Sequence, residues 1–562
     1  MTHPPTEPRP RDSVSHSSPG RGPSRRGLLA GTALVAAGLM TRAWPAAAVT
    51  QHPSALHTAS DFSRMTSVVN AGLQPWQDGW AKLLANSHAQ SGWTPNPQAT
   101  VYRGSDSSDN YGTLYNDIAA AYQNGLRWKI SQNAACGQTA ANILNAWANT
   151  LTKIDGNADR FLAAGIYGYQ FANAGELMRG HSAFDVTAFK NMMRNVFYPL
   201  NDSFLDNHNG AYITNYWASW DLCNMASVLA IGILCDDDTL VGQAVDYFNN
   251  GAGNGSLENA IPYVYASEGL AQWQESGRDQ GHTTLGIGLM GIVCEMAWNQ
   301  GYDLYGADSN RFLKACEYVA KYNLGYDVPF TPYTVHVGAP GVWEGWNEYD
   351  TVGADGRGSI RPVWELIYSH YVGRKGLSAP YTARYASQGR AEGGGGDYGP
   401  NSGGYDQLGF GTLTALRDKG SVTAGVYTFT NEYSGKNLDN GSTSTEGAQV
   451  MQWTPNSGAN SQRWRLTDAG NGYWTLTSVY SGKNLDNGNT TTEGANAIQW
   501  TANGGNAQQW KVTDAGNGCY LLVNRMSGKD LDNGSGTADG AKCVQWTANH
   551  GTPQRWRAVK VA

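Results

Sequence analysis

Between residues 60 and 330, apolar positions recur every three to four residues, which is the spacing of α-helices with one buried face. From 140 to 151, for example, Ile143, Trp147 and Leu151 follow one another at intervals of four. The same periodicity predicts further helices over 118–128, 161–178, 217–234, 285–298 and 312–322. Helices joined by Gly-, Asn- and Asp-rich loops predict helix pairs stacked into a ring or solenoid, with loops that line a cleft.

From about residue 425 the pattern changes to short segments that occur three times. The motif Ser-Gly-Lys-Asn-Leu-Asp-Asn at 434–440 returns at 481–487 and, nearly unchanged, at 527–533, at intervals of 47 and 46 residues. Each repeat also contains a Gln-Trp pair and closes with Gln-x-Trp. One unit of this length cannot bury its apolar face alone, whereas three packed together can. We therefore expect the closing tryptophans to be core residues: Trp464, Trp510 and Trp556.

The composition fits a modular globular protein and narrows the choice of partners. At 562 residues, the chain is long enough for roughly three or four domain-sized units. It is rich in tryptophan (20) and tyrosine (30), whose flat rings with polar edges suit both cores and sugar-binding clefts. A net charge of −7 argues against a nucleic-acid partner and means that local cations must hold any acidic substrate. We expect a monomer without a membrane partner, cofactor or metal.

The first 48 residues have the features of an export signal. A polar start leads to Ser-Arg-Arg-Gly-Leu-Leu at 24–29, an apolar run over 30–40 and three alanines at 46–48. Paired arginines before Leu-Leu predict a twin-arginine signal peptide and a secreted, extracellular protein. A membrane anchor is the alternative, but the apolar run is shorter than the ~20 residues that a span requires.

Seven cysteines fit an exported protein without forming a disulfide scaffold. Cys519 and Cys543 occur only in the third repeat, where the second has Tyr473 and Ala497, and two cysteines gained together predict a disulfide. The other five lie in apolar, helix-like segments and are expected to be packed thiols, with one pairing among them left open: Cys136, Cys223, Cys235, Cys294 and Cys316.

One stretch of the helical part places ionisable groups directly before a buried segment. If residues 275–282 are helical, four side chains at i, i+3, i+4 and i+7 project from one face: Glu275, Arg278, Asp279 and His282. The apolar segment that follows contains Gly286, Gly288 and Gly291, as expected of a helix packed close to its neighbours. Burying ionisable side chains at the start of such a helix costs free energy unless they pair with one another or serve a function. The spacing fits an ion-pair network at a helix end and a functional site equally well.

Several motifs resemble the alginate lyase superfamily of polysaccharide lyases, in the family's order over residues 65–415. They include Leu-Arg-Trp-Lys-Ile at 126–130, Asn-Tyr-Trp-Ala-Ser-Trp-Asp-Leu at 215–222, the stretch 275–282 and Arg-Pro-Val-Trp-Glu-Leu-Ile-Tyr at 361–368. The resemblance implies an (α/α) toroid that cleaves uronic-acid polymers, a class that includes alginate and glucuronan. The three repeats resemble a ricin-type β-trefoil, which implies a carbohydrate-binding domain.

The expected architecture is therefore an all-α toroid followed by an all-β trefoil. We expect a signal peptide over 1–48, a catalytic domain over 55–418, a linker over 419–424 and the trefoil over 425–562.

Cleavage of a 4-linked uronate by β-elimination makes three chemical demands. A cation must neutralise the C6 carboxylate, a base must take the C5 proton, and an acid must protonate the leaving O4. Arginine offers a bidentate clamp and asparagine donates without titrating, so Arg278 is the candidate clamp, assisted by Asn215. His282 is the candidate base or acid. Asn215 fits the N-cap of the next helix equally well.

The remaining candidates surround these groups. Trp217 and Trp220 can stack on sugar rings, although packing against a neighbouring helix explains them equally well. Glu275, Asp279 and Gln280 are expected beside the substrate, where the two acids would orient Arg278 and His282.

A tyrosine is missing from its usual place in the family. In the better-known alginate lyases, a tyrosine shortly after the arginine acts in the proton transfers, but none lies between Arg278 and Met290. Either His282 takes that role or a tyrosine comes from another loop, and four are available: Tyr216, Tyr333, Tyr349 and Tyr368.

The trefoil also departs from its family. Ricin-type sugar pockets use an Asp early in each repeat, which Asp439, Asp486 and Asp532 match. The Gln and Asn positions of the family pocket hold other residues, so a galactose-type pocket does not follow. Because side chains alternate along a strand, we expect three glutamines to point to the opposite face: Gln452, Gln499 and Gln545.

Two other function classes stay open. A glycoside hydrolase on the same toroid would need a pair of carboxylates, for which the chain offers Asp221, Glu275, Asp279, Glu344 and Glu348. A non-catalytic carbohydrate-binding protein would need no such pair. Only a lyase leaves an unsaturated uronate, which absorbs ultraviolet light.

Overall fold

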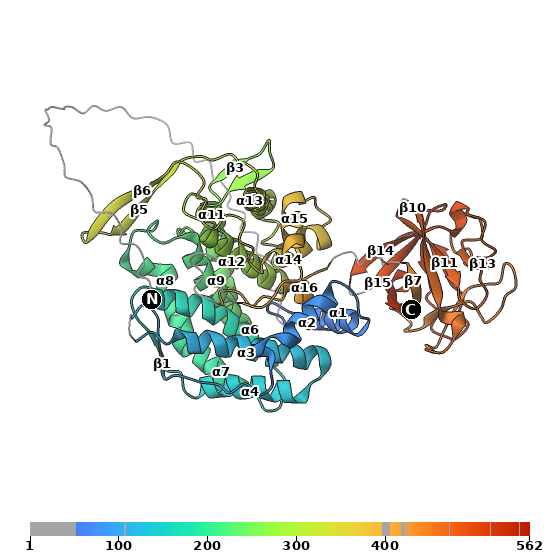
Figure 1. Cartoon of the computed structure of the whole chain (residues 1–562), viewed down its shortest axis with the longest axis horizontal. Helices are drawn as coiled ribbons and strands as arrows, with labels where there is room; N and C mark the ends of the chain where they lie inside the picture. The colour runs from blue at the N-terminus through green and yellow to red at the C-terminus, as the bar shows by residue number, and fades with distance from the viewer. Residues whose placement is uncertain are drawn as a thin grey trace, which may run out of the picture. The chain divides into compact units, whose positions relative to one another are not determined.

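The computed structural model describes residues 52–105, 108–395, 405–417, 422, 424–470, 472–516, 519–549 and 551–561. The predicted signal peptide at 1–48 lies outside the described residues, and so does most of the predicted linker. The expected order is confirmed, because helices extend to Thr414 and the strands of a β-domain begin at Gly425 (Figure 1).

The helical domain is built from an inner row of buried helices, each of which packs on the next. The inner row comprises α3 (Tyr111–Ser131), the continuous run of α5 (Asp159–Leu162), η3 (Ala163–Tyr167) and α6 (Gly168–Met178), then α9 (Ala218–Cys235), α12 (Gln280–Asn299) and α14 (Trp364–Tyr368). An outer helix follows each of them: α4 (Ala134–Ala148), the continuous run of α7 (Val186–Met192), η4 (Met193–Phe197) and α8 (Tyr198–Asn207), α10 (Asp238–Asn250), α13 (Ala307–Asn323) and α15 (Pro380–Gly389).

This alternation gives the inner helices a common direction, because each outer helix brings the chain back. Contacts between neighbouring inner helices include one between the starts of α9 and α12. The Arg103 guanidinium lies 5.0 Å from the ring of Tyr111, the first residue of α3, and 5.5 Å from the ring of Tyr167, where η3 continues into α6. The guanidinium of Arg278, just before α12, lies 4.9 Å from the ring of Trp217 at the start of α9.

Shorter elements complete this domain. They are α2 (Trp76–Ala85), α11 (Leu257–Ala260), α16 (Gly411–Thr414), the parallel pair β1 (Thr100–Tyr102) and β2 (Lys153–Asp155), and two antiparallel hairpins, β3 (Tyr263–Tyr265) with β4 (Leu270–Gln272) and β5 (Tyr333–Ala339) with β6 (Trp343–Tyr349). The β5–β6 hairpin stands out from the helices (Figure 1).

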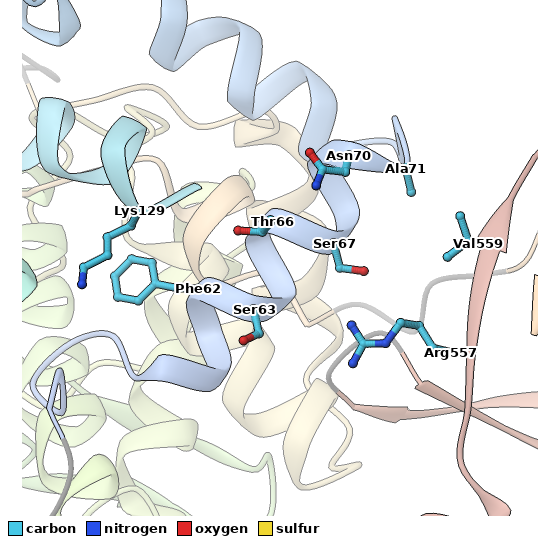
Figure 2. A pocket seen from close by; sticks show the side chains of 9 residues that line it. All are labelled: Phe62, Ser63, Thr66, Ser67, Asn70, Ala71, Lys129, Arg557 and Val559. Carbon is cyan, nitrogen blue, oxygen red and sulfur yellow. The ribbon is translucent and has the colours of Figure 1, made fainter. Parts of the chain in front are cut away.

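Local chemistry fixes where the first helix, α1 (Ala59–Asn70), begins. The Thr58 hydroxyl accepts from the Asp61 N–H while the Asp61 carboxylate accepts from the Thr58 N–H, which is a capping box. One turn further, Phe62 points toward Lys129, whose ammonium lies 5.7 Å from the ring centroid (Figure 2).

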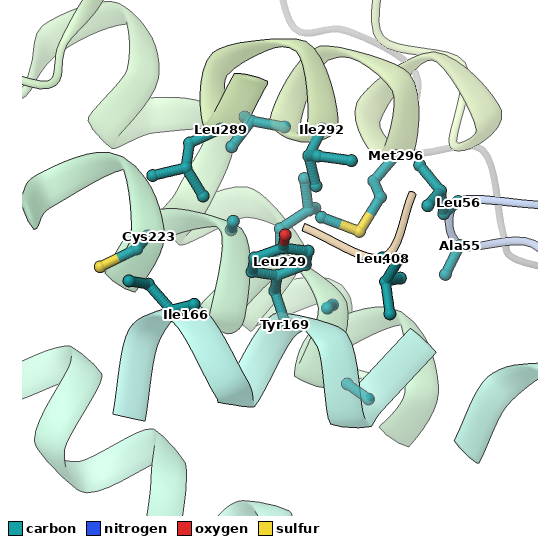
Figure 3. Packing of buried hydrophobic residues seen from close by; sticks show 14 of the residues in the cluster. Ala55, Leu56, Ile166, Tyr169, Cys223, Leu229, Leu289, Ile292, Met296 and Leu408 are labelled. Atoms are coloured by element: carbon teal, nitrogen blue, oxygen red, sulfur yellow. The ribbon is translucent and has the colours of Figure 1, made fainter. Parts of the chain in front are cut away.

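The core is formed where the inner helices meet the segment 405–417. Figure 3 shows Tyr169 of α6, Leu229 of α9 and Ile292 of α12 around Leu408 of this segment. The Tyr169 hydroxyl donates to the Asp406 carbonyl at 2.8 Å. Of the described helices, only α9 is long and apolar enough to span a membrane, but it is 94% buried here, as a core helix would be.

The predicted close packing of α12 is confirmed. A Cβ on Gly286 would lie 2.6 Å from Trp273 Cζ2, and one on Gly288 would lie 2.6 Å from Val363 Cγ1. Both positions therefore need glycine, because real Cβ atoms do not approach a neighbour that closely.

The β-domain is a trefoil whose six barrel strands close on themselves. The barrel comprises β7 (Gly425–Asn431), β10 (Trp464–Gly470), β11 (Tyr473–Ser478), β14 (Trp510–Gly516), β15 (Cys519–Asn524) and β18 (Trp556–Lys560). Three hairpins add β8 (Asn437–Asp439) with β9 (Met451–Trp453), β12 (Asn484–Asp486) with β13 (Ile498–Trp500), and β16 (Asp530–Asp532) with β17 (Val544–Trp546). The closing tryptophans are fully buried, which confirms their predicted core role: Trp464, Trp510 and Trp556.

The predicted disulfide between Cys519 and Cys543 is wrong, because Cys543 is a buried free thiol. Cys543 occupies the axis of the trefoil, where its N–H donates to the Val450 carbonyl at 3.0 Å and its carbonyl accepts from the Ala497 N–H at 2.9 Å. Cys519 begins β15, where it pairs with Arg557 of β18, whereas Cys543 directly precedes β17.

The five cysteines of the helical domain are buried free thiols, as expected of packed side chains: Cys136, Cys223, Cys235, Cys294 and Cys316.

Candidate functional site

The stretch predicted to be helical from Glu275 is instead a turn, and α12 begins only at Gln280. Asp279 is the N-cap of that helix, with an extended backbone (φ −168°) and a carboxylate Oδ1 that accepts from the His282 N–H at 2.7 Å. An aspartate that caps a helix in this way cannot also be part of it, which is why the single helical face does not form. The turn before it packs closely under the β5–β6 hairpin, since a Cβ on Gly277 would lie 2.7 Å from Tyr349 Cβ.

The four ionisable side chains nevertheless meet. The imidazole Nδ1 of His282 lies 2.7 Å from Asp279 Oδ2, and its Nε2 lies 3.2 Å from Arg278 Nη2. Arg278 Nε lies 3.4 Å from Asp279 Oδ2, and Arg278 Nη1 lies 3.8 Å from Glu275 Oε1. The turn and the helix cap thus bring the four side chains into contact, although the expected helical face does not form.

These contacts favour one tautomer of the histidine. Because Asp279 can accept from Nδ1–H and Arg278 can only donate, the two contacts suit the tautomer with its lone pair on Nε2. Burial acts to raise the pKa of Asp279, but the hydrogen bond from His282 and the nearby Arg278 outweigh it and hold the pKa below its usual range. An anionic Asp279 then favours any positive charge that develops on the imidazole.

Glu275 lies behind the arginine and is fully buried. The Ser219 hydroxyl donates to its Oε1 at 2.9 Å, and the Trp273 indole N–H donates to its Oε2 at 3.4 Å. Burial raises the pKa of this carboxyl, while Arg278 and His282 act against the rise. Its buried position suits the predicted role of orienting Arg278 rather than contact with a substrate.

Arg278 has the features of an anion-binding group. Its side chain is 27% exposed, and the face of its guanidinium lies against Trp217, 4.9 Å from the ring centroid. Within the described part of the chain, Nη1 has no hydrogen-bond partner. That atom is buried and faces Glu275, so Nη2 is the donor left for a carboxylate, on a guanidinium held over an aromatic ring.

Of the four candidate tyrosines, the structure brings Tyr349 and Tyr333 to this site. The Tyr349 ring lies 5.6 Å from that of Trp217 and stacks on Tyr333 at 5.1 Å. The Tyr333 hydroxyl is engaged, since it donates to the Gln274 carbonyl at 2.5 Å. Burial raises the pKa of Tyr349, although Arg278 lowers it, so the phenol keeps its proton at neutral pH.

The other two tyrosines lie elsewhere. Tyr216 packs against Trp220 at 4.7 Å, and Tyr368 lies under Arg390, whose guanidinium is 5.2 Å from its ring.

Of three further predicted site residues, Asn215 and Gln280 hold loops around the cluster, whereas Trp220 packs in a separate aromatic group. Asn215 is not an N-cap: its Oδ1 accepts from the Gly338 N–H at 2.7 Å and so ties the β5–β6 hairpin to the loop before α9. Trp220 packs against Phe204 and Tyr216, whereas Trp217 faces Arg278. Gln280 is buried, and its amide donates to the Gly353 carbonyl at 2.9 Å, which holds the loop after β6.

In the trefoil, Asp439, Asp486 and Asp532 occupy equivalent positions. Each carboxylate Oδ1 accepts from the N–H of a turn glycine two residues later, at 2.7, 2.8 and 2.7 Å. On β8 and β9, Asp439 pairs with Met451 while Leu438 pairs with Gln452, so Asp439 and Trp453 project from the same face of the hairpin. The predicted opposite orientation of the three glutamines is confirmed, because all of them are fully buried: Gln452, Gln499 and Gln545.

The sequence did not single out a further set, the platform tryptophans Trp453, Trp500 and Trp546. These rings are 45%, 41% and 42% exposed. Each packs on a glycine of another repeat, for example Trp500 on Gly447, where a Cβ would lie 3.2 Å from the ring. The Gln-Trp pairs marked these positions, but the sequence could not show that the indole is outside while the glutamine is inside.

Comparisons with known proteins agree with this division of the chain. A family model described as alginate lyase matches residues 36–328, and a model described as ricin-type beta-trefoil lectin domain-like matches 413–500 and 506–562. A search of curated proteins finds no match.

Solved structures show similarity over about a quarter of the chain. The designed 3-fold symmetric protein ThreeFoil is 42% identical over 24% of this chain and 99% of its own, with a TM-score of 0.24. The exo-beta-1,3-galactanase 1,3Gal43A from Clostridium thermocellum is 41% identical over 25% of this chain and 31% of its own, also with a TM-score of 0.24.

Proposed function

The chain belongs to the alginate lyase family, and we propose that its toroid cleaves a 4-linked uronic-acid polymer, alginate or glucuronan, by β-elimination. It is a polysaccharide lyase with a C-terminal carbohydrate-binding module. The observation that carries the proposal is the cluster of Arg278, Asp279 and His282 beneath Trp217 and Tyr349.

Arg278 would neutralise the C6 carboxylate. Removal of the C5 proton places negative charge on that carboxylate, and stabilisation of developing charge is usually the largest single contribution to catalysis. The Nη2 now shared with His282 is the donor available for it, because Nη1 is buried and faces Glu275. Glu275 and Asp279 hold the guanidinium from behind.

His282 would be the base. When the substrate carboxylate takes Nη2 of Arg278, the lone pair of His282 Nε2 is released to accept the C5 proton. The electrons of the C5–H bond form the C4–C5 double bond, and the C4–O4 bond breaks. Asp279, already hydrogen-bonded to Nδ1, stabilises the imidazolium that results.

Tyr349 would be the acid that gives its phenolic proton to the leaving O4. Its protonated state at neutral pH fits that role. The imidazolium then returns a proton to the phenolate, directly or through water, and both groups regain their starting states.

The trefoil would hold the enzyme on carbohydrate through its three equivalent sites, each with an aspartate and a platform tryptophan on one hairpin face. The export signal predicted at 1–48 would suit an enzyme that meets its polymer outside the cell.

The test is ultraviolet absorbance during incubation of the mature chain with alginate and, separately, with glucuronan, beside the Arg278→Ala and His282→Ala variants. We expect absorbance to rise with one of the polymers and to stay flat in both variants. New reducing ends without absorbance would instead indicate a hydrolase, and no product from either polymer would contradict the proposal.

A further inference from the structure

The β5–β6 hairpin connects the candidate site to two exposed tryptophans. Its base supplies Tyr333 and Tyr349, which pair directly across the two strands. Trp343, at its other end, is 59% exposed, and Trp346, at its middle, is 63% exposed. An exposed indole offers a flat apolar face with a polar edge, which suits contact with a sugar ring.

The two tryptophans lie on opposite faces of the hairpin, because successive side chains of a strand alternate. Trp343 shares the face of Tyr349, together with Gly345 and Asn347. Trp346 lies on the other face, between Glu344 and Glu348.

On the Tyr349 face, Trp343 forms a flat platform. A Cβ on Gly345 would lie 3.7 Å from Trp343 Cζ2 and 3.6 Å from Val337 Cγ2, so the indole lies back along the strand toward Tyr349. Val337 beneath it is buried. The ring reaches Gly345, four residues from Tyr349, which corresponds to roughly 13 Å along the strand.

The Trp346 face is different in charge and in packing. Its indole stacks on His336 at 4.5 Å, and Tyr212 covers the His336 ring at 3.7 Å. The flanking carboxylates of Glu344 and Glu348 would repel a polymer with a negative charge on every sugar. The Tyr349 face of this hairpin has no acidic residue between Trp343 and Tyr349.

We propose that Trp343 is a subsite for the uronate polymer beyond the cleavage point, where the indole stacks on the apolar face of a sugar residue. The inference rests on the proposed function, since it takes the polymer bound at Arg278 and Tyr349 and extends it along the same face of the hairpin. Short oligouronates that fill only the cleavage site would not reach Trp343, whereas the polymer would.

The experiment measures elimination kinetics of the full chain on the polymer and on short oligouronates for the wild type, Trp343→Ala and the matched variant Trp346→Ala. Both substitutions remove an exposed indole from β6, so any general effect on the hairpin is common to them. Loss of the stacked ring should raise KM for the polymer about five- to tenfold in Trp343→Ala alone, with kcat unchanged. Activity on the short oligouronates should stay at the wild-type level in both variants.

The outcomes separate this inference from the proposed function. An active wild type with equal kinetics in Trp343→Ala would overturn the subsite and leave the lyase assignment in place. Equal losses in the two variants would also overturn it, since the effect would then belong to the hairpin as a whole. A wild type without elimination activity on any uronate polymer would overturn both.

Discussion

Asp279 has two functions that one substitution can separate. Its Oδ1 caps α12 through the His282 N–H at 2.7 Å, and its Oδ2 accepts from His282 Nδ1 at 2.7 Å. In Asp279→Asn, the amide oxygen can still cap the helix, but the amide nitrogen is a donor and cannot accept from Nδ1–H. The imidazole should then lose the tautomer that leaves its lone pair on Nε2.

The expected magnitudes differ for stability and activity. Asparagine caps a helix as well as aspartate does, so the free energy of unfolding of Asp279→Asn should lie within about 1 kcal/mol of the wild-type value. For Asp279→Ala, it should be about 1–2 kcal/mol lower. Both variants should lose at least about a hundredfold in kcat/KM, because a positioned base contributes about 10²–10⁴ in rate. Since the pKa of Asp279 is below its ordinary value, the carboxylate is ionised at pH 7, where the comparison should be made.

The assays are urea unfolding followed by circular dichroism and the ultraviolet elimination assay. Comparable activity losses with different stabilities would support the assignment. A fully active Asp279→Asn enzyme would refute the argument that Asp279 sets the tautomer of His282. If activity fell only in the variant that loses stability, the role of Asp279 would be limited to capping the helix.

Three further predictions concern packing, pH and the trefoil. Gly288→Ala should lower the free energy of unfolding in urea by about 1–3 kcal/mol, because its Cβ would lie 2.6 Å from Val363 Cγ1. Gly291→Ala, whose Cβ would lie 3.3 Å from its nearest neighbour, should change that free energy by less than about 1 kcal/mol. Equal losses in the two variants would contradict the packing argument. Burial lowers the pKa of His57 to about 4, so the unfolded state binds more protons than the folded state between pH 6.5 and 4. The free energy of unfolding should therefore fall by up to about 3 kcal/mol as the pH is lowered from 6.5 to 4. His57→Gln should flatten this pH dependence of the unfolding midpoint, and an unchanged slope would exclude His57 as its source. Replacement of all platform tryptophans by alanine should abolish retardation in polysaccharide affinity gels and leave elimination of short oligouronates unchanged, and retained retardation would place sugar binding elsewhere.

The helices of the toroid could be predicted because their evidence is local. The apolar periodicity of 217–234 corresponds closely to α9 at Ala218–Cys235, and that of 312–322 lies within α13. The prediction failed at 275–282, where the ionisable spacing also suited a helix. An aspartate can continue a helix or cap one, and its extended backbone at Asp279 was decided by the packing of the preceding turn under the hairpin.

The disulfide prediction failed for a related reason. Two cysteines gained in one repeat suggested proximity, but sequence distance within a trefoil repeat says little about separation in the barrel. One position lies on the axis and the other at the start of a barrel strand.

The sequence by itself determined the order of the two domains, the core tryptophans of the repeats and the set of ionisable groups at Arg278, because each of these follows from local periodicity or repetition. Only the tertiary structure decided which tyrosine accompanies Arg278. Tyr349 lies 71 residues further along the chain, and it reaches the site because the β5–β6 hairpin is tied back to the loop before α9 through Asn215. Contacts between distant segments depend on how elements pack, and no local pattern in a single sequence records that.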